Sequence, residues 1–248
     1  IATNITSGMG MLGLMGPKSR AVLESICKQD FSNDGFAFGQ SRMIELGFAH
    51  VRASRITYVG ELGWELYVGT EFMPHLFDLL CEAGEDFGLK HAGYHAMNAC
   101  RTEKGYRHWG HDITDEDTPL QAGLGFAVAF DKSGGFIGRD RLLQDRELGL
   151  PTRRMIQLAL ECDDETTPLM YHEEPIWVNG VRCGAITSGT WAYRLGKSIG
   201  MGYITHGDPI SKDFIESSEF HIEIANKKYK ATASLRPLYD PKSSRIRS

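Results

Sequence analysis

The sequence has few cysteines, no long apolar run and no excess of basic residues, and each shortage removes a class of protein. The net charge of −5 argues against a nucleic-acid-binding protein, which usually carries a basic face. No segment approaches the roughly 20 apolar residues that span a bilayer. The odd number of cysteines, without CxxC spacing, argues against a disulfide framework and favours a reducing compartment. The five are Cys27, Cys81, Cys100, Cys162 and Cys183.

What remains is the composition of an ordinary globular protein with both helices and strands. Of its 248 residues, 42% are hydrophobic and 24% charged. Apolar periodicity predicts helices over residues 17–27, from Thr70 to before Gly88, over 92–103 and over 139–148. After Pro151 the pattern changes to alternating apolar and polar residues, as in 153–161 and 219–225. Asn179-Gly180 and Asn226-Lys227 predict hairpin turns there. We therefore expect an α+β fold, with one domain over 1–150 and a small antiparallel β-barrel over 151–248.

The segment 55–68 contains the most informative candidate site. It predicts two strands joined by a glycine-bounded turn, with Glu65 between Trp64 and Leu66. Period-two geometry places Glu65 and Tyr67 on one face of the strand and Trp64 and Leu66 on the other. Pattern alone favours a solvated Glu65. The alternative is a ligand site, in which the carboxylate accepts two adjacent N–H donors of a flat heterocycle such as a pterin. Tyr58, across the predicted hairpin, would supply a flat packing surface.

Other candidate sites are weaker. His108, His111 and Asp112 do not form a complete ligand set, so no metal is predicted. The nucleophile motif GxSxG is absent, and the early glycines do not complete GxGxxG. Arg101 and Glu103, close together near a helix end, are interpreted as a structural ion pair.

Several spaced motifs resemble the folate-binding aminomethyltransferase (glycine-cleavage T-protein) family over essentially the whole chain. EKGYRHWG and the closing segment 238–247 are most similar to the C-terminal part of dimethylglycine and sarcosine dehydrogenases. The motifs are YVGELGWE (58–65), EKGYRHWGHD (103–112), TPLQAGLGF (118–126), FIGR (136–139), GAITSG (184–189) and IGMGY (199–203).

This resemblance implies a function. In the dehydrogenases a separate N-terminal FAD domain oxidises an N-methyl group, and the folate domain joins the one-carbon unit to tetrahydrofolate, giving 5,10-methylenetetrahydrofolate. The implied partners are folate, a small N-methylated amine and an N-terminal segment or FAD domain that is absent from these residues. No nucleic acid or membrane is implied. The implied location is the cytoplasm in a bacterium and the mitochondrial matrix in a eukaryote.

The resemblance also assigns residues. Tyr58 matches the tyrosine that lies along the pterin, and Glu65 matches the carboxylate that accepts from its amino edge. Leu66 and Tyr67 are expected to line the same pocket. Phe126 stands where the family usually places tryptophan or tyrosine near the folate. The family's catalytic aspartate belongs to a segment before Ile1, so no catalytic residue is assigned and residues 1–248 alone are expected to be inactive.

Two alternatives stay open. One is a free-standing aminomethyltransferase of the glycine cleavage system, although T-proteins carry a folate-holding arginine where this sequence has Met97. The other is a non-catalytic regulatory subunit of the same architecture.

Overall fold

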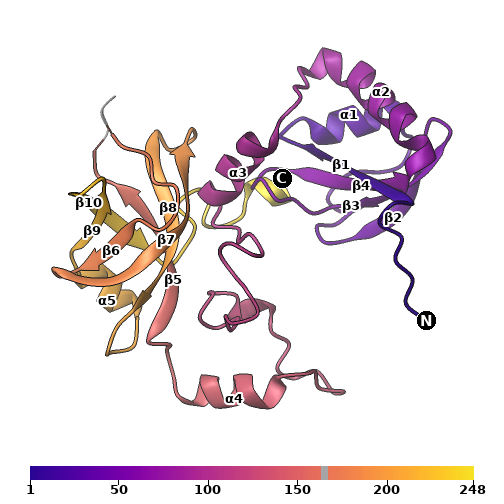
Figure 1. Ribbon diagram of the computed structural model, residues 1–248. Coiled ribbons are helices and arrows are strands. Elements are labelled where there is room, and N and C mark those ends of the chain that lie inside the picture. Colours follow the sequence, from indigo (N-terminus) through magenta and orange to yellow (C-terminus); the bar gives the residue numbers. More distant parts are fainter. Residues whose placement is uncertain (163–166) are drawn as a thin grey trace. The chain divides into compact units, whose positions relative to one another are not determined.

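The computed structural model describes residues 1–162 and 167–248, which divide into two compact units. One unit comprises Ile1–Met97 and Lys242–Ser248, and the other comprises Asn98–Pro241 (Figure 1). The chain thus returns to the first unit after completing the second. This division rests on compactness, whereas the domain boundary at 150/151 is predicted from a change in sequence pattern. That boundary stays a prediction.

The first unit is built on a four-stranded antiparallel sheet with strand order β1-β4-β3-β2. Its strands are β1 (Met9–Met15), β2 (Ser41–Leu46), β3 (Ala49–Ser54) and β4 (Gly63–Gly69). Its helices are α1 (Ser19–Ile26) and α2 (Met73–Gly84), with short 3-10 turns at Thr70–Phe72, Glu85–Phe87 and Arg245–Arg247.

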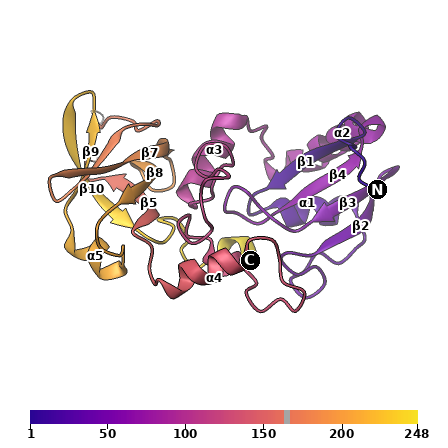
Figure 2. The same ribbon diagram turned by 60° about the horizontal axis from the view of Figure 1, so that its bottom comes forward.

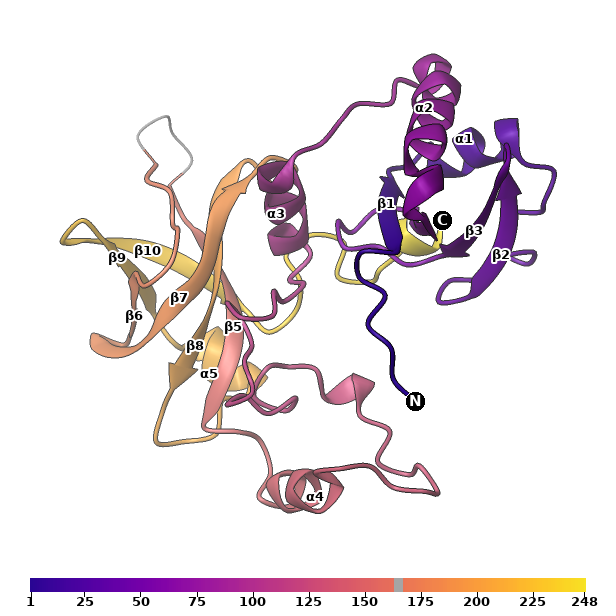
Figure 3. The same ribbon diagram turned by 45° about the vertical axis from the view of Figure 1, so that its right-hand side comes forward.

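Helices α1 and α2 pack on the same face of this sheet, as Figure 3 shows. Val22 and Leu23 of α1 and Leu76 of α2 share one apolar core with Trp64 and Leu66 of β4. The alternate side chains of the strands point to the other face, where they are half-buried or exposed. The sheet therefore has one apolar face under helices and one polar face, as period-two patterning requires.

The helix predictions for this unit are confirmed. Pro74 lies in the first turn of α2, where its missing N–H costs no hydrogen bond. Gly88 ends the helical segment in the left-handed conformation, with φ of 74°. Helix α1 begins at Ser19, two residues later than predicted.

The predicted hairpin over 55–68 is wrong in its first strand. Strand β3 ends at Ser54, and residues 55–62 form a loop that joins it to β4. Arg55 leaves the sheet because its guanidinium is buried, donating to the carbonyl of Phe36 and the side chain of Asn33. Ser54, not Tyr58, is consequently the residue paired with Glu65.

The second unit contains a closed six-stranded barrel with strand order β10-β5-β8-β7-β6-β9, and all its strand pairs are antiparallel. Figure 2 views the same barrel from a second direction. This confirms the predicted α+β class with an antiparallel barrel, and closure leaves no unpaired edge strand. The strands are β5 (Arg153–Leu160), β6 (Pro175–Val178), β7 (Val181–Ala192), β8 (Lys197–Thr205), β9 (Phe220–Ile224) and β10 (Lys227–Ser234).

Three helices accompany the barrel sequence. Helix α3 (Tyr94–Glu103) includes the division between the units and is followed by Gly105 with φ of 67°. Helix α4 (Arg139–Glu147) precedes Gly149, with φ of 94°, and α5 (Lys212–Ser217) lies between β8 and β9. The predicted helices at 92–103 and 139–148 are confirmed. Within the described residues, no helix has the length and apolar character needed to cross a membrane.

One turn prediction is confirmed and another is displaced. Asn179 and Gly180 both have positive φ, of 51° and 83°, as a two-residue hairpin requires. In the second hairpin Ile224 pairs with Lys227, so the turn residues are Ala225 and Asn226, one position earlier than predicted.

Strand β5 does not alternate in burial as predicted. Six consecutive residues, from Met155 to Leu160, are buried. Ile156 and Leu158 fill the barrel, while Met155 packs outside it against Met201 and Tyr203. Both faces are covered, so the alternation in sequence does not become alternation in exposure.

Candidate functional site

Glu65 and Tyr67 project together from the uncovered face of β4. The Tyr67 hydroxyl donates a hydrogen bond to Glu65 Oε2, and both side chains are half-buried. Among the described residues, no other donor reaches the Glu65 carboxylate. A carboxylate has about four acceptor positions, so Oε1 and part of Oε2 stay available to a ligand.

The neighbours of Glu65 across the sheet are small. Gly13 of β1 and Ser54 of β3 are its direct partners in the antiparallel register. A Cβ added to Gly13 would meet only the end of the Met15 side chain, at 3.4 Å. With small neighbours on both sides and unfilled acceptor positions, the Glu65 carboxylate has the chemistry to bind a flat ring with adjacent N–H donors.

Leu66 lies on the opposite face. Its side chain is fully buried in the core under α1 and α2, together with that of Trp64. The structure brings Glu65 and Tyr67 together and separates the Leu66 side chain from them, so Leu66 contributes no side chain to the uncovered face.

Tyr58 lies in the loop 55–62 and is half-buried. The loop leaves β3 at the buried Arg55 and re-enters the sheet at Gly63. Gly60 within it has φ of 73°, which glycine adopts without strain. Tyr58 thus lies in a loop rather than in a strand paired with β4, and its assignment as a pterin contact stays a prediction.

Phe126 belongs to the second unit, in the 3-10 turn Gly125–Ala127, and its side chain is 87% exposed. The following residues Ala127 and Val128 line an open hollow of about 550 Å³, whose other wall includes Phe136 and Leu142. Its assignment as a folate contact stays a prediction.

The hydrogen bond to Glu65 raises the pKa of Tyr67 to about 12, with burial and the negative charge of Glu65 adding to the effect. Tyr67 therefore keeps its proton and remains a donor throughout the physiological range. Because the folded-state pKa is raised, any stability from this bond is complete below about pH 10, the ordinary tyrosine value, and is lost as the pH rises through about 12.

We expect spectrophotometric titration to resolve a tyrosine that ionises near pH 12. In Glu65→Gln its pKa should fall towards the ordinary value, because the charged acceptor is gone. Tyr67→Phe should delete the same transition. Because burial also raises the pKa of Tyr203 to about 12, two tyrosines should ionise near that pH in the wild type and one in Tyr67→Phe, so an amplitude that Tyr67→Phe leaves unchanged would contradict the prediction.

Sequence reasoning missed a buried polar cluster in the second unit. Asp112 is 1% exposed and accepts from Arg101, from the backbone N–H of His108 and from the Thr187 hydroxyl. Arg101, equally buried, also donates to Ser188 Oγ at 2.8 Å. The cluster links α3, the loop after it and strand β7, so it positions that loop on the barrel.

The predicted Arg101–Glu103 pair is wrong. Glu103 instead binds Arg194, whose guanidinium lies 4.0 Å from the centroid of the Tyr239 ring. Residues two apart on a helix point in different directions, which is why each residue takes a distant partner. The neighbouring Lys104 likewise binds Asp240, at 3.0 Å.

His108 and His111 stack on one another, with ring centroids 4.7 Å apart. Burial, followed by the charge of Arg101 and then His111, lowers the pKa of His108. Over residues 1–162 and 167–248, no three His, Cys, Asp or Glu side chains gather as a metal site would require.

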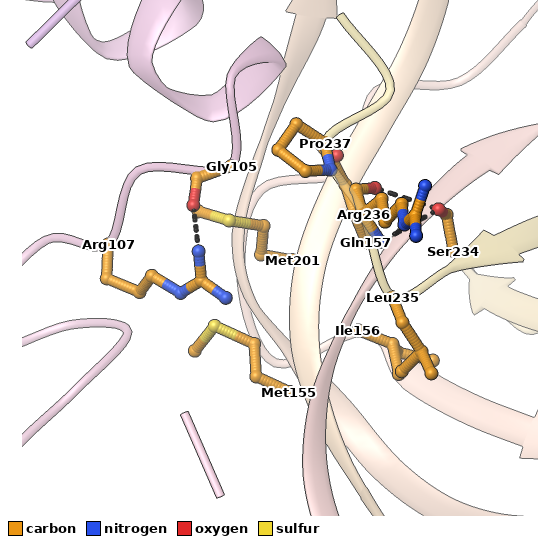
Figure 4. Close-up of a pocket in the computed structure, with 10 residues that line it drawn as sticks. All are labelled: Gly105, Arg107, Met155, Ile156, Gln157, Met201, Ser234, Leu235, Arg236 and Pro237. Carbon is orange, nitrogen blue, oxygen red and sulfur yellow. Dashed lines mark hydrogen bonds between the residues drawn. The ribbon is translucent and has the colours of Figure 1, made fainter. Parts of the chain in front are cut away.

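A small cavity lies beside Arg107 in the second unit, between Met155, Met201 and Gln157 (Figure 4). Its volume of about 20 Å³ is enough for one water molecule. It is far too small for a folate or an amine substrate.

Two family models match this chain. The GCVT N-terminal domain matches residues 1–132, and the glycine cleavage T-protein C-terminal barrel domain matches residues 153–240. The chain belongs to the glycine cleavage T-protein family. The family resemblance expected from the motifs is confirmed, and the matched barrel model coincides with the closed barrel of the structure.

Most of the curated relatives of this chain are much longer proteins than the chain itself. It is 39% identical over 242 residues to the 4-methylaminobutanoate oxidase (formaldehyde-forming) of Paenarthrobacter nicotinovorans, which covers 98% of the chain and 28% of that protein. Identity to human mitochondrial sarcosine dehydrogenase is 36%, over 96% of the chain and 26% of that protein. The aminomethyltransferase of Halothermothrix orenii is 37% identical, over 82% of the chain and 55% of that protein. The chain thus spans about a quarter of the first two relatives and about half of the third.

The fold of this family member is also found in a solved structure. The glycine cleavage system aminomethyltransferase T of Bartonella henselae superposes with a TM-score of 0.76 at 24% identity, covering 94% of this chain and 60% of that one. This likeness supports the architecture alone.

Proposed function

We propose that the chain is the tetrahydrofolate-binding part of a demethylating dehydrogenase of the dimethylglycine and sarcosine type, which passes a one-carbon unit to tetrahydrofolate and yields 5,10-methylenetetrahydrofolate. The observation that carries the proposal is Glu65, a half-buried carboxylate held by Tyr67 on an uncovered sheet face, with open acceptor positions. Support from the relatives lies in two amine-oxidising enzymes among them, the sarcosine and dimethylglycine dehydrogenases.

In this proposal the residues of the chain bind the pterin ring of tetrahydrofolate and orient it. Glu65 accepts from the amino group and ring N–H of the pterin, Tyr67 fixes the rotamer of Glu65, and Tyr58 packs along the ring. Tetrahydrofolate, when bound, supplies the nucleophilic nitrogens that take up the one-carbon unit. Holding these nitrogens in place against the incoming electrophile lowers the activation barrier by several kcal/mol. Proximity and orientation can supply about 7–11 kcal/mol at most. We expect the amine oxidation itself to require an FAD domain, and we assign no catalytic residue to this chain.

Partners and location follow the same proposal. The partners are folate and a small N-methylated amine. The location is the cytoplasm in a bacterial host and the mitochondrial matrix in a eukaryotic one. Relatives whose names include the word mitochondrial support the second location.

Glu65→Gln should weaken tetrahydrofolate binding at least tenfold in the intact protein. One charged acceptor is replaced by a neutral amide that presents an N–H₂ group to donors, a loss of about 1.4 kcal/mol or more. Isothermal titration calorimetry measures the change directly.

Glu45→Gln is the matched control for this measurement. Glu45 lies on β2 of the same sheet, its side chain is 77% exposed, and its nearest ionic neighbour is His50, at 3.9 Å. We expect it to leave the affinity unchanged. Equal affinities of the wild type and Glu65→Gln would remove the pterin assignment. Tetrahydrofolate binding without any one-carbon transfer from dimethylglycine or sarcosine would favour the aminomethyltransferase or the regulatory subunit instead.

A further inference from the structure

Arg52 lies on the same uncovered sheet face as Glu65, one strand away. Along β3, Val51 and Ala53 are fully buried, whereas Arg52 is exposed between them, so it points away from the core. In the register of β3 with β4, Arg52 pairs with Tyr67 and Ser54 pairs with Glu65. Arg52 is therefore the diagonal neighbour of Glu65.

The Arg52 guanidinium makes no hydrogen bond or ion pair with any residue that the structure describes, and it differs in this from Arg42 and Arg55 of the same unit. Arg55 is held by backbone and side-chain acceptors, and Arg42 donates to Gln40 while lying 5.0 Å from the centroid of the Phe36 ring. Arg52 thus offers up to five N–H donors beside a carboxylate with free acceptor positions.

Diagonal neighbours on antiparallel strands are about 7–8 Å apart, within reach of long side chains. A direct pair with Glu65 is the simplest use of Arg52, but the Tyr67 hydroxyl binds the carboxylate instead. Arg52 and Ser54 of β3 share one sheet face with Tyr67 and Glu65 of β4, so a ligand that lies over Ser54 would be within reach of both the carboxylate and the guanidinium.

The pterin ring of a folate carries a matching pattern on one edge. Its 2-amino group and N3–H are adjacent donors, and the 4-oxo oxygen next to them is an acceptor. We propose that Arg52 is a specificity-determining residue that donates to the 4-oxo oxygen while Glu65 accepts from the two donors. This inference rests on the proposed function and adds to it a recognition of the 2-amino-4-oxo pattern. A 2,4-diamino ring would present an amino group to Arg52, donor against donor.

The test compares two ligands on three intact proteins: wild type, Arg52→Met and Arg52→Lys. The ligands are tetrahydrofolate and its 2,4-diamino analogue, and the readout is calorimetric affinity. Arg52→Met should weaken tetrahydrofolate binding about tenfold, as expected when a charged donor to a carbonyl is lost. The same substitution should leave the diamino analogue equal or tighter, so the preference between the two ligands falls by at least tenfold. Arg52→Lys, which keeps a charged donor, should restore part of the preference.

Arg42→Met is the matched control. Arg42 lies on the adjacent strand β2 and pairs with Ala53, so its position belongs to the other face. It should leave both affinities unchanged. An equal loss for both ligands in Arg52→Met would overturn the inference, because a merely structural or electrostatic role does not discriminate them. The inference would also be overturned if Arg52→Met left the preference for tetrahydrofolate over the diamino analogue unchanged. If Glu65→Gln leaves tetrahydrofolate affinity intact, the proposed function itself fails, a result separate from either of these.

Discussion

Asp112→Ala should lower the free energy of unfolding of the second unit by about 3–5 kcal/mol, the cost of removing one partner from a buried ion pair. Asp112 and Arg101 are 1% and 2% exposed. The substitution leaves the Arg101 cation in the interior with only neutral acceptors, among them Asn98 and the Tyr106 carbonyl. It also removes the acceptor for the His108 N–H and the Thr187 hydroxyl.

Hydrogen exchange of amides in β5, β7 and β8 measures this loss separately from the other unit. Asp115→Ala, in the exposed part of the same loop, is the control and should stay within about 0.5 kcal/mol of the wild type. Replacing both Arg101 and Asp112 by apolar residues of similar volume should cost much less than Asp112→Ala, because no charge is then left buried. A loss under about 1 kcal/mol in Asp112→Ala would show that the pair is solvated in solution.

Trp64→Ala should destabilise the first unit by about 3–5 kcal/mol, the range for removing a large aromatic side chain from a core. Trp64 is fully buried, and the edges of Phe31 and Phe36 meet it at centroid distances of 5.7 and 6.1 Å. The Arg55 guanidinium also lies 5.7 Å from its ring centroid. Alanine would leave a cavity that these rigid rings fill only in part.

Urea unfolding monitored by hydrogen exchange in β3 and β4 tests this prediction. Within the described residues the Trp64 indole N–H has no hydrogen-bond partner. Trp64→Phe, which deletes that orphaned donor while keeping an aromatic ring, should therefore cost only about 1–2 kcal/mol. Trp109→Ala is the surface control, since that side chain is 67% exposed. Equal stabilities of Trp64→Ala and Trp109→Ala would contradict the packing described for this core.

Much of the fold could be predicted from local patterns. Pro74 and Gly88 bracket α2 because they act on their own backbone conformation, and Asn179-Gly180 marks a hairpin for the same reason. The prediction at Asn226-Lys227 was displaced by one residue because two adjacent positions both tolerate a turn, and only the pairing of Ile224 with Lys227 decides between them.

The candidate site was predictable to a different degree at each residue. Alternation along β4 placed Glu65 with Tyr67 and away from Trp64, since the side-chain period of a strand is fixed by its backbone. The same rule already separated Leu66 from Glu65, and the structure shows that separation as full burial. The prediction that Tyr58 lies in a strand opposite Glu65 was wrong because no local sequence pattern indicates that β3 ends at Ser54. The cause is the burial of Arg55 against residues 33 and 36, about 20 positions away.

By itself the sequence determined the family, the α+β class with its antiparallel barrel, and the face on which Glu65 stands, because motifs, periodicity and turn residues act over a few neighbouring positions. Tertiary structure alone decided the partners of the charges. Arg101 takes Asp112 and Glu103 takes Arg194, across 11 and 91 positions, and Arg52 comes beside Glu65 through the register of β3 with β4. Coulomb and hydrogen-bond energies depend on distance in space, and distance in space between remote residues exists only once the chain has folded.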